Sequence, residues 1–101
     1  IVDRVRRTLA EHLPGDASPV KLATVLGMSS RSLQRRLKEH GTSYAQVLRD
    51  TRRELAANYL REQHCSITEI AFLLGFEDAS AFARAFRSWT GVSPSEFRAQ
   101  T

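Results

Sequence analysis

The fold is decided by residues 66–78, which read SITEIAFLLGFED. Ser66 and Glu69 have the spacing of a capping box, in which each side chain accepts a hydrogen bond from the other residue's backbone N–H. The apolar residues that follow recur at helical spacing and stop at Gly75, where glycine tolerates the left-handed backbone of a sharp turn. The stretch therefore predicts a short amphipathic helix that ends in a tight turn.

The same pattern occurs once more in the chain. The first copy lies 48 positions upstream, so that Leu22, Ala23, Leu26 and Gly27 are matched by Ile70, Ala71, Leu74 and Gly75. After a one-residue insertion the match continues into a second helix, where Leu33, Arg35 and Leu37 are matched by Phe82, Arg84 and Phe86. A helix that ends at glycine, with a small alanine that lets the next helix pack closely, is typical of a helix-turn-helix. The sequence therefore predicts two such units.

Helical periodicity and capping signals extend over the rest of the chain and predict an all-α fold of seven helices. The longest run, from Ser43 to about Gln63, predicts a connecting helix with Ser43 and Gln46 as its capping box. The expected organisation is a first helix-turn-helix subdomain at residues 1–42, the connecting helix at 43–63 and a second subdomain at 64–101.

The composition excludes several classes of function. Cys65 is the only cysteine and the three histidines are scattered, so neither a disulfide nor a metal or cofactor site is predicted. The sequence has no glycine-rich phosphate loop, nucleophile elbow or evident pair of catalytic acids, which predicts that the chain is not an enzyme. No apolar run approaches the ~20 residues that cross a bilayer, and the cysteine content fits a reducing cytoplasm. A formal net charge of +4 is compatible with a nucleic-acid partner without demonstrating one.

The second helix of the first unit carries the strongest candidate contacts. Its leucines face the core, so its other face presents Arg31, Gln34, Arg35 and Lys38. Arginine can donate two hydrogen bonds to guanine, and glutamine can pair with adenine in the major groove of DNA. We therefore predict that Arg31, Gln34 and Arg35 read bases and that Ser30 and Lys38 contact the DNA backbone.

The matching helix of the second unit is poorer in polar groups. Three alanines lie among its outward positions, where they can touch thymine methyl groups, and we predict base reading by Ser80 and Arg84 and a backbone contact by Arg87. The first unit should therefore dominate discrimination between sequences. The aromatic residues of this helix, Phe82, Phe86 and Trp89, are spaced as core residues rather than as stacking platforms for single strands.

The connecting helix adds a spacing argument and one further candidate. A helix of roughly 20 residues is about 30 Å long, close to the ~34 Å between successive major-groove entries on one face of DNA. One chain is therefore expected to occupy two successive grooves. Arg49, Arg52 and Arg53 share a side of this helix, and Arg52 is our backbone candidate, although pairing with Asp50 or Glu54 is equally open.

These residues resemble the DNA-binding region of the AraC/XylS family of bacterial transcription regulators. The resemblance is most specific over residues 66–78, at Phe82, Arg84, Phe86 and Arg87, and over the GVSPSEFR segment at 91–98. It implies a two-lobed, seven-helix domain that binds double-stranded promoter DNA and contacts RNA polymerase. It also implies a separate effector-binding or dimerisation domain before this segment, and the start at Ile1 rather than Met predicts a fragment of a longer cytoplasmic activator or repressor.

A second interpretation remains open. The same basic face could belong to an all-helical module that binds another protein rather than DNA. The two hypotheses differ in salt dependence, because only the neutralisation of several phosphates makes affinity fall steeply as salt is added.

Overall fold

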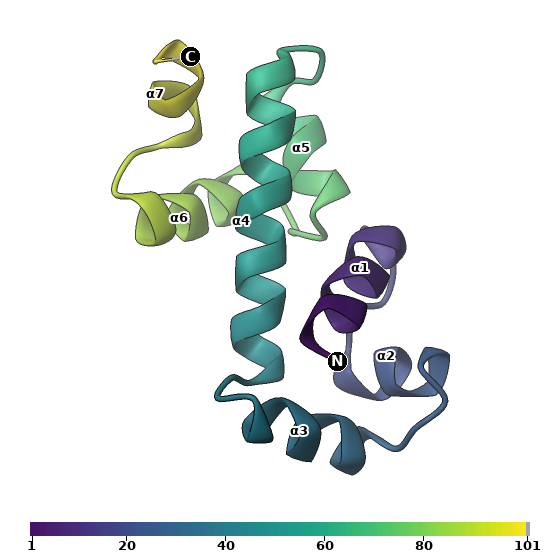
Figure 1. The fold of residues 1–101 in the computed structure, drawn as a ribbon. Coiled ribbons are helices and arrows are strands. Elements are labelled where there is room, and N and C mark those ends of the chain that lie inside the picture. The colour runs from purple at the N-terminus through teal and green to yellow at the C-terminus, as the bar shows by residue number, and fades with distance from the viewer. Residues whose placement is uncertain (101) are drawn as a thin grey trace. The chain divides into compact units, whose positions relative to one another are not determined.

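The computed structural model describes residues 1–100, and those residues form seven α-helices without a β-strand (Figure 1). This confirms the predicted all-α fold. The helices are α1 (Val2–His12), α2 (Pro19–Val25), α3 (Ser30–Glu39), α4 (Tyr44–Glu62), α5 (Ile67–Leu73), α6 (Ala79–Thr90) and α7 (Pro94–Ala99).

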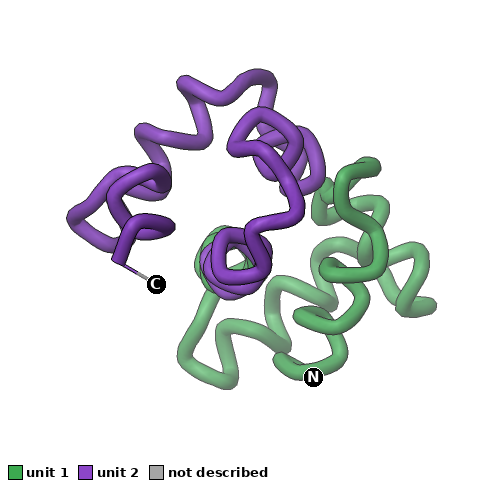
Figure 2. The backbone as a smooth tube through the Cα atoms, turned by 90° about the horizontal axis from the view of Figure 1, so that it is seen from above, with its two compact units in different colours: residues 1–52 green, residues 53–101 purple. Residues whose placement is uncertain are grey.

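The chain divides into two compact units (Figure 2). The first comprises residues 1–52 and the second begins at Arg53, so the division falls inside α4. The N-terminal half of α4 therefore packs with α1, α2 and α3, and its C-terminal half packs with α5, α6 and α7.

Each unit has its own apolar core. The core of the first unit consists of side chains that are at most 7% exposed: Val5, Leu9, Leu22, Ala23, Leu33, Leu37, Tyr44 and Val47. The core of the second unit has side chains that are at most 1% exposed: Ala56, Leu60, Ile70, Ala71, Leu74, Phe82 and Phe86. The prediction that Phe82 and Phe86 are core residues is confirmed, and Trp89 lies half-buried against the same cluster.

The predicted repeat is visible in the backbone of the two turns. Gly27 and Gly75 adopt left-handed φ angles of 75° and 86°. In each turn the N–H of the residue after the glycine donates to the carbonyl of the matched alanine, at 2.9 Å from Met28 to Ala23 and again at 2.9 Å in the second unit. The same bond therefore sets the path from the first helix to the second in both units.

The helix starts follow the predicted capping signals. Ser18 and Ser29 accept hydrogen bonds from backbone N–H groups at the starts of α2 and α3. Full capping boxes form at the starts of α5 and α7, the first of them between Ser66 and Glu69. These side chains satisfy backbone donors that have no partner within the helix.

The box predicted at the start of α4 is only half formed, and this part of the prediction is wrong. Ser43 Oγ accepts from the Gln46 N–H at 3.2 Å, as expected. The Gln46 side chain, however, donates to Asp50 Oδ1 at 2.9 Å and accepts a hydrogen bond from Arg49. Charged partners one turn ahead give stronger hydrogen bonds than a neutral backbone N–H, so the amide turns forward along the helix.

Substitutions of Phe82 and Phe72 test the packing of the core in the second unit. Phe82 is fully buried, whereas Phe72 is 67% exposed on α5. Phe82→Ala should lower the free energy of unfolding by about 3–5 kcal/mol, because it removes buried surface and leaves a cavity. Phe72→Ala should change it by less than about 0.5 kcal/mol. Urea denaturation followed by circular dichroism measures both, and equal losses would contradict the assigned packing.

Candidate nucleic-acid interface

The outward face of α3 brings together the side chains predicted for the first unit. Arg31, Gln34, Arg35 and Lys38 are all exposed, while the leucines on the other side of α3 are fully buried. Positions three and four apart on a helix are neighbours, so these four groups form one continuous polar surface. Three of them are cations, which gives the face a positive charge.

Local contacts leave the donors of this face available. Ser30 Oγ accepts a hydrogen bond from Gln34 Nε2 at 3.0 Å, which orients the amide and leaves its second N–H and its oxygen for a ligand. Arg35 Nε lies 3.8 Å from Glu39 Oε1, and both side chains are about two-thirds exposed, at 68% and 65%. An exposed pair at this distance contributes little stability, so the guanidinium can exchange it for a stronger partner.

The structure extends this surface to residues that sequence analysis missed. A depression beside α3 is lined by Gln34, Arg35, Lys38, Thr42, Ser43 and Tyr44. Thr42 brings a half-buried hydroxyl group from the turn after α3 to the same place. The turn at Gly41 was visible in the sequence, but the side of α3 to which it returns is a property of the tertiary fold.

The outward face of α6 is less polar. Ser80, Arg84 and Arg87 are exposed, as is Ser88, which sequence analysis missed although it lies four residues after Arg84 on the same side. The alanines of α6 are half-buried, because they flank the phenylalanines that enter the core. They therefore offer less outward surface than the sequence suggested.

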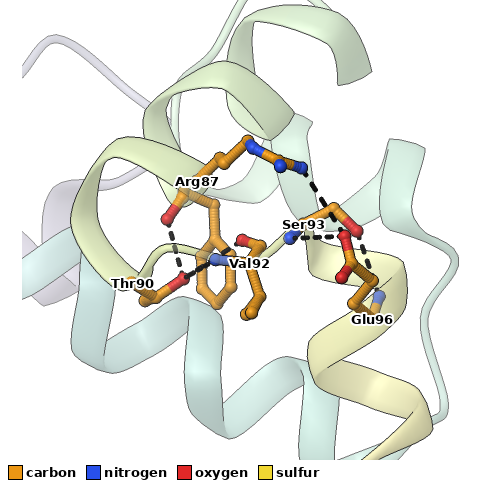
Figure 3. A network of polar contacts seen from close by, with 6 residues as sticks. Arg87, Thr90, Val92, Ser93 and Glu96 are labelled. Atoms are coloured by element: carbon orange, nitrogen blue, oxygen red, sulfur yellow. Dashed lines mark hydrogen bonds and ion pairs between the residues drawn. The ribbon is translucent and has the colours of Figure 1, made fainter.

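Arg87 also connects α6 to α7. Its guanidinium lies 3.6 Å from Glu96 Oε1, and Glu96 in turn forms the capping box of α7 with Ser93 (Figure 3). Both members of the ion pair are more than half exposed, at 67% and 55%. Arg84 makes no ion pair among the described residues. Its guanidinium is therefore more readily available to a ligand than that of Arg87.

Arg52 differs from the other candidates because it is half-buried. Burial lowers the pKa of its guanidinium, and the nearby Tyr44 opposes this shift. Burial also raises the pKa of Tyr44 to about 12, and its hydroxyl donates a hydrogen bond to the carbonyl of Ala17. Arg52 therefore lies at the edge of the first core, and its predicted contact with the DNA backbone stays a prediction.

The described part of the chain holds no group of three or more His, Cys, Asp and Glu side chains that could bind a metal ion. Within the same residues, no helix combines the length and the apolar character of a membrane span. The side chains predicted to read bases, Arg31, Gln34, Arg35, Ser80 and Arg84, are all exposed on helix surfaces.

The sequence of the chain matches a known family of domains and a known regulator. The pattern that defines a helix-turn-helix domain matches residues 22–100. The chain is 48% identical over 99 residues to the ornithine utilization regulator of Pseudomonas aeruginosa, an alignment that covers 97% of this chain and 29% of that protein. The chain thus spans less than a third of the length of this relative.

Two solved structures are similar over nearly the whole chain. A transcriptional regulator with an AraC-type DNA-binding domain from Chromobacterium violaceum has a TM-score of 0.86 and 25% identity, covering 98% of this chain and 89% of that chain. The DNA-binding domain of AdpA, a global transcriptional factor solved with a target DNA, has a TM-score of 0.83 and 30% identity, covering 98% and 90%.

The stability that Glu96 contributes to the second unit should depend on pH. Hydrogen bonds from Ser93 lower the pKa of Glu96, and the positive charge of Arg87 lowers it further. The ionised carboxylate is therefore favoured in the folded state, so its stabilisation is complete above the ordinary pKa of 4.5 and is lost as the pH falls through the lowered value. Glu96→Gln should be less stable than the unsubstituted chain at neutral pH, and the difference should close as the pH falls through the lowered pKa of Glu96.

Urea denaturation between about pH 7 and pH 3 measures this difference. The control is Glu77→Gln, which changes an exposed acid before α6 that makes no ion pair among the described residues. It should keep the pH dependence of the unsubstituted chain. A loss at Glu96→Gln that stayed constant down to the lowest pH would assign the effect to packing rather than to ionisation.

Proposed function

Since the chain belongs to the helix-turn-helix family of AraC-type transcription regulators, we propose that it binds double-stranded promoter DNA in a sequence-specific manner. In this proposal α3 and α6 enter successive major grooves. The observation that carries it is the outward face of α3, where Arg31, Gln34 and Arg35 stand exposed above a helix side that is fully buried.

In this proposal the two units have different roles in DNA recognition. The α3 face supplies two guanidinium groups and an amide for base edges, and Ser30 and Lys38 contact the DNA backbone. Ser30 also orients the Gln34 amide. The α6 face supplies Ser80 and Arg84 for bases, and Arg87 and Arg52 complete the backbone contacts. The first unit therefore carries most of the discrimination, and the second adds phosphate contacts and fit to the shape of the groove.

The same proposal covers the longer protein. We infer that the domain acts in the bacterial cytoplasm, contacts RNA polymerase at the promoter, and works with an effector-binding or dimerisation domain that precedes it. The support is that the ornithine utilization regulator matches this chain over only 29% of its own length. We also propose that the domain has no enzymatic activity of its own, since a surface of exposed helix side chains provides binding rather than a protected reaction site.

A salt titration separates DNA binding from the alternative of a protein partner on the same face. Lys38, Arg52 and Arg87 are three cationic backbone candidates, so the logarithm of the affinity should fall with the logarithm of the salt concentration at a slope of about −3. Fluorescence anisotropy with a labelled duplex from a selected pool measures the slope. A flat dependence would contradict the release of counterions from DNA and favour the protein partner.

The pair Arg35→Ala and Lys38→Ala tests the roles within α3. Arg35→Ala should cost about 1–3 kcal/mol on the preferred site and relax the preference at one base pair, because it removes a bidentate base contact. Lys38→Ala should weaken all sequences about equally and reduce the magnitude of the salt slope by about 1. Selection from random duplex DNA measures both, with Glu39→Gln, a change one helical turn from Arg35, as the control for the neighbouring ion pair. An unchanged selected motif for Arg35→Ala would remove its base-reading role.

A further inference from the structure

A groove in the second unit takes no part in the proposed DNA contacts. One wall is the side of α4 that carries Arg53, Ala57 and Arg61, and the opposite wall is formed by Phe86, Val92 and Phe97. On α6, Phe86 lies about 200° around the helix from Arg84. The groove therefore opens on a different side of α6 from the predicted base-reading residues.

Both walls of the groove are held in place. Thr90 Oγ1 donates to the carbonyl of Phe86 at 2.9 Å and accepts from the N–H of Val92 at 3.3 Å, which sets the turn after α6 (Figure 3). Arg98 Nε donates to the carbonyl of Leu60 at 3.2 Å and ties α7 to the end of α4. A ligand would therefore meet a formed groove, and little ordering of the chain would oppose binding.

The charged side chains that line the groove are both positive. Arg53 and Arg61 are exposed and no carboxylate is among the lining side chains. The Arg61 guanidinium lies 5.7 Å from the centre of the Phe97 ring and contacts Asn58, and Arg53 makes no ion pair among the described residues. Arg53 and Arg61 thus make no ion pair among the described residues and lie opposite a wall of apolar side chains, which favours a ligand that is both anionic and apolar.

We propose that this groove binds an extended acidic peptide segment of another protein, with two carboxylates on either side of one apolar side chain. Arg53 and Arg61 are eight positions apart on α4, which corresponds to a rise of about 12 Å. Residues four apart in an extended peptide span about 13 Å and point to the same side, as does the residue between them. The sequence of the segment is therefore acid, any residue, apolar, any residue, acid.

DNA phosphate is the weaker ligand for this site. It would satisfy the two guanidinium groups but leave the apolar wall at Val92 and Phe97 without a contact. A second copy of this chain is disfavoured by its net charge of +4, because like charges repel. The acidic peptide uses both features of the groove at once.

The test uses the 101-residue chain, labelled with nitrogen-15, and the synthetic peptide acetyl-Glu-Ser-Leu-Ser-Glu-amide. Titration followed by two-dimensional NMR should shift the amide signals of Arg53, Ala57, Arg61, Val92 and Phe97 in a saturable manner. The peptide with glutamine in place of both acids, and the peptide with serine in place of leucine, should each bind at least fivefold more weakly. Equal binding of the three peptides would overturn the proposal.

Variants locate the binding and exclude DNA. Arg53→Gln and Arg61→Gln should each weaken the acidic peptide about threefold to fivefold and together more than tenfold, whereas Arg49→Gln, on an exposed position of α4 outside the groove, should leave the affinity unchanged. Shifts confined to the α3 and α6 faces, or an equal effect of Arg49→Gln, would overturn the proposal. So would a duplex DNA that displaces the peptide and loses affinity in Arg53→Gln and Arg61→Gln, because the groove would then bind phosphate. Since duplex binding is scored separately, the peptide result stands or falls independently of the proposed function.

Discussion

The structure depends on one backbone hydrogen bond that occurs in both units. In each turn a glycine with a left-handed φ brings the next N–H onto an alanine carbonyl, at 2.9 Å from Met28 to Ala23 and from Phe76 to Ala71. The alanine has to be small because the following helix passes close to it. Without this bond the apolar side of α3 would not meet the core, and its polar side would not have a defined direction.

Most of this arrangement could be predicted from the sequence because its signals are local. Ser66, Glu69 and Gly75 act within one or two turns of the helix that they begin or end. The choice among competing side-chain partners could not be predicted, as Gln46 shows by bonding forward to Asp50 instead of back to the helix start. Long-range contacts were also hidden, because Arg98 reaches a carbonyl 38 positions away and nothing in its own neighbourhood marks that partner. The residues of the candidate interface followed from helical spacing, but the hydrogen bond that orients Gln34 did not.

The two units have the same arrangement of helices and turns, but different side chains pack their cores. The second helix of the first unit packs leucines, whereas α6 packs Phe82 and Phe86, whose ring centroids lie 5.7 Å apart. Large rings need small neighbours, and the alanines of α6 are half-buried beside them. The space that aromatic packing takes is therefore lost to long polar side chains on the flanks of α6. The weaker polar face of the second unit is thus partly a consequence of its core.

Arg87 could bind a phosphate of a ligand without disturbing the start of α7. The 3.6 Å pair with Glu96 is exposed, so a phosphate that offers a stronger contact can replace the carboxylate at little cost. Glu96 would then lose one partner but keep the capping box, because Ser93 donates to its carboxylate through the backbone N–H at 3.3 Å. The hydrogen bonds of Ser93 are also the main reason that the pKa of Glu96 is low, so the carboxylate stays ionised after Arg87 leaves. Neither Arg87 nor Glu96 lines the groove beside α7, so an exchange of partners at Arg87 leaves the lining of that groove in place.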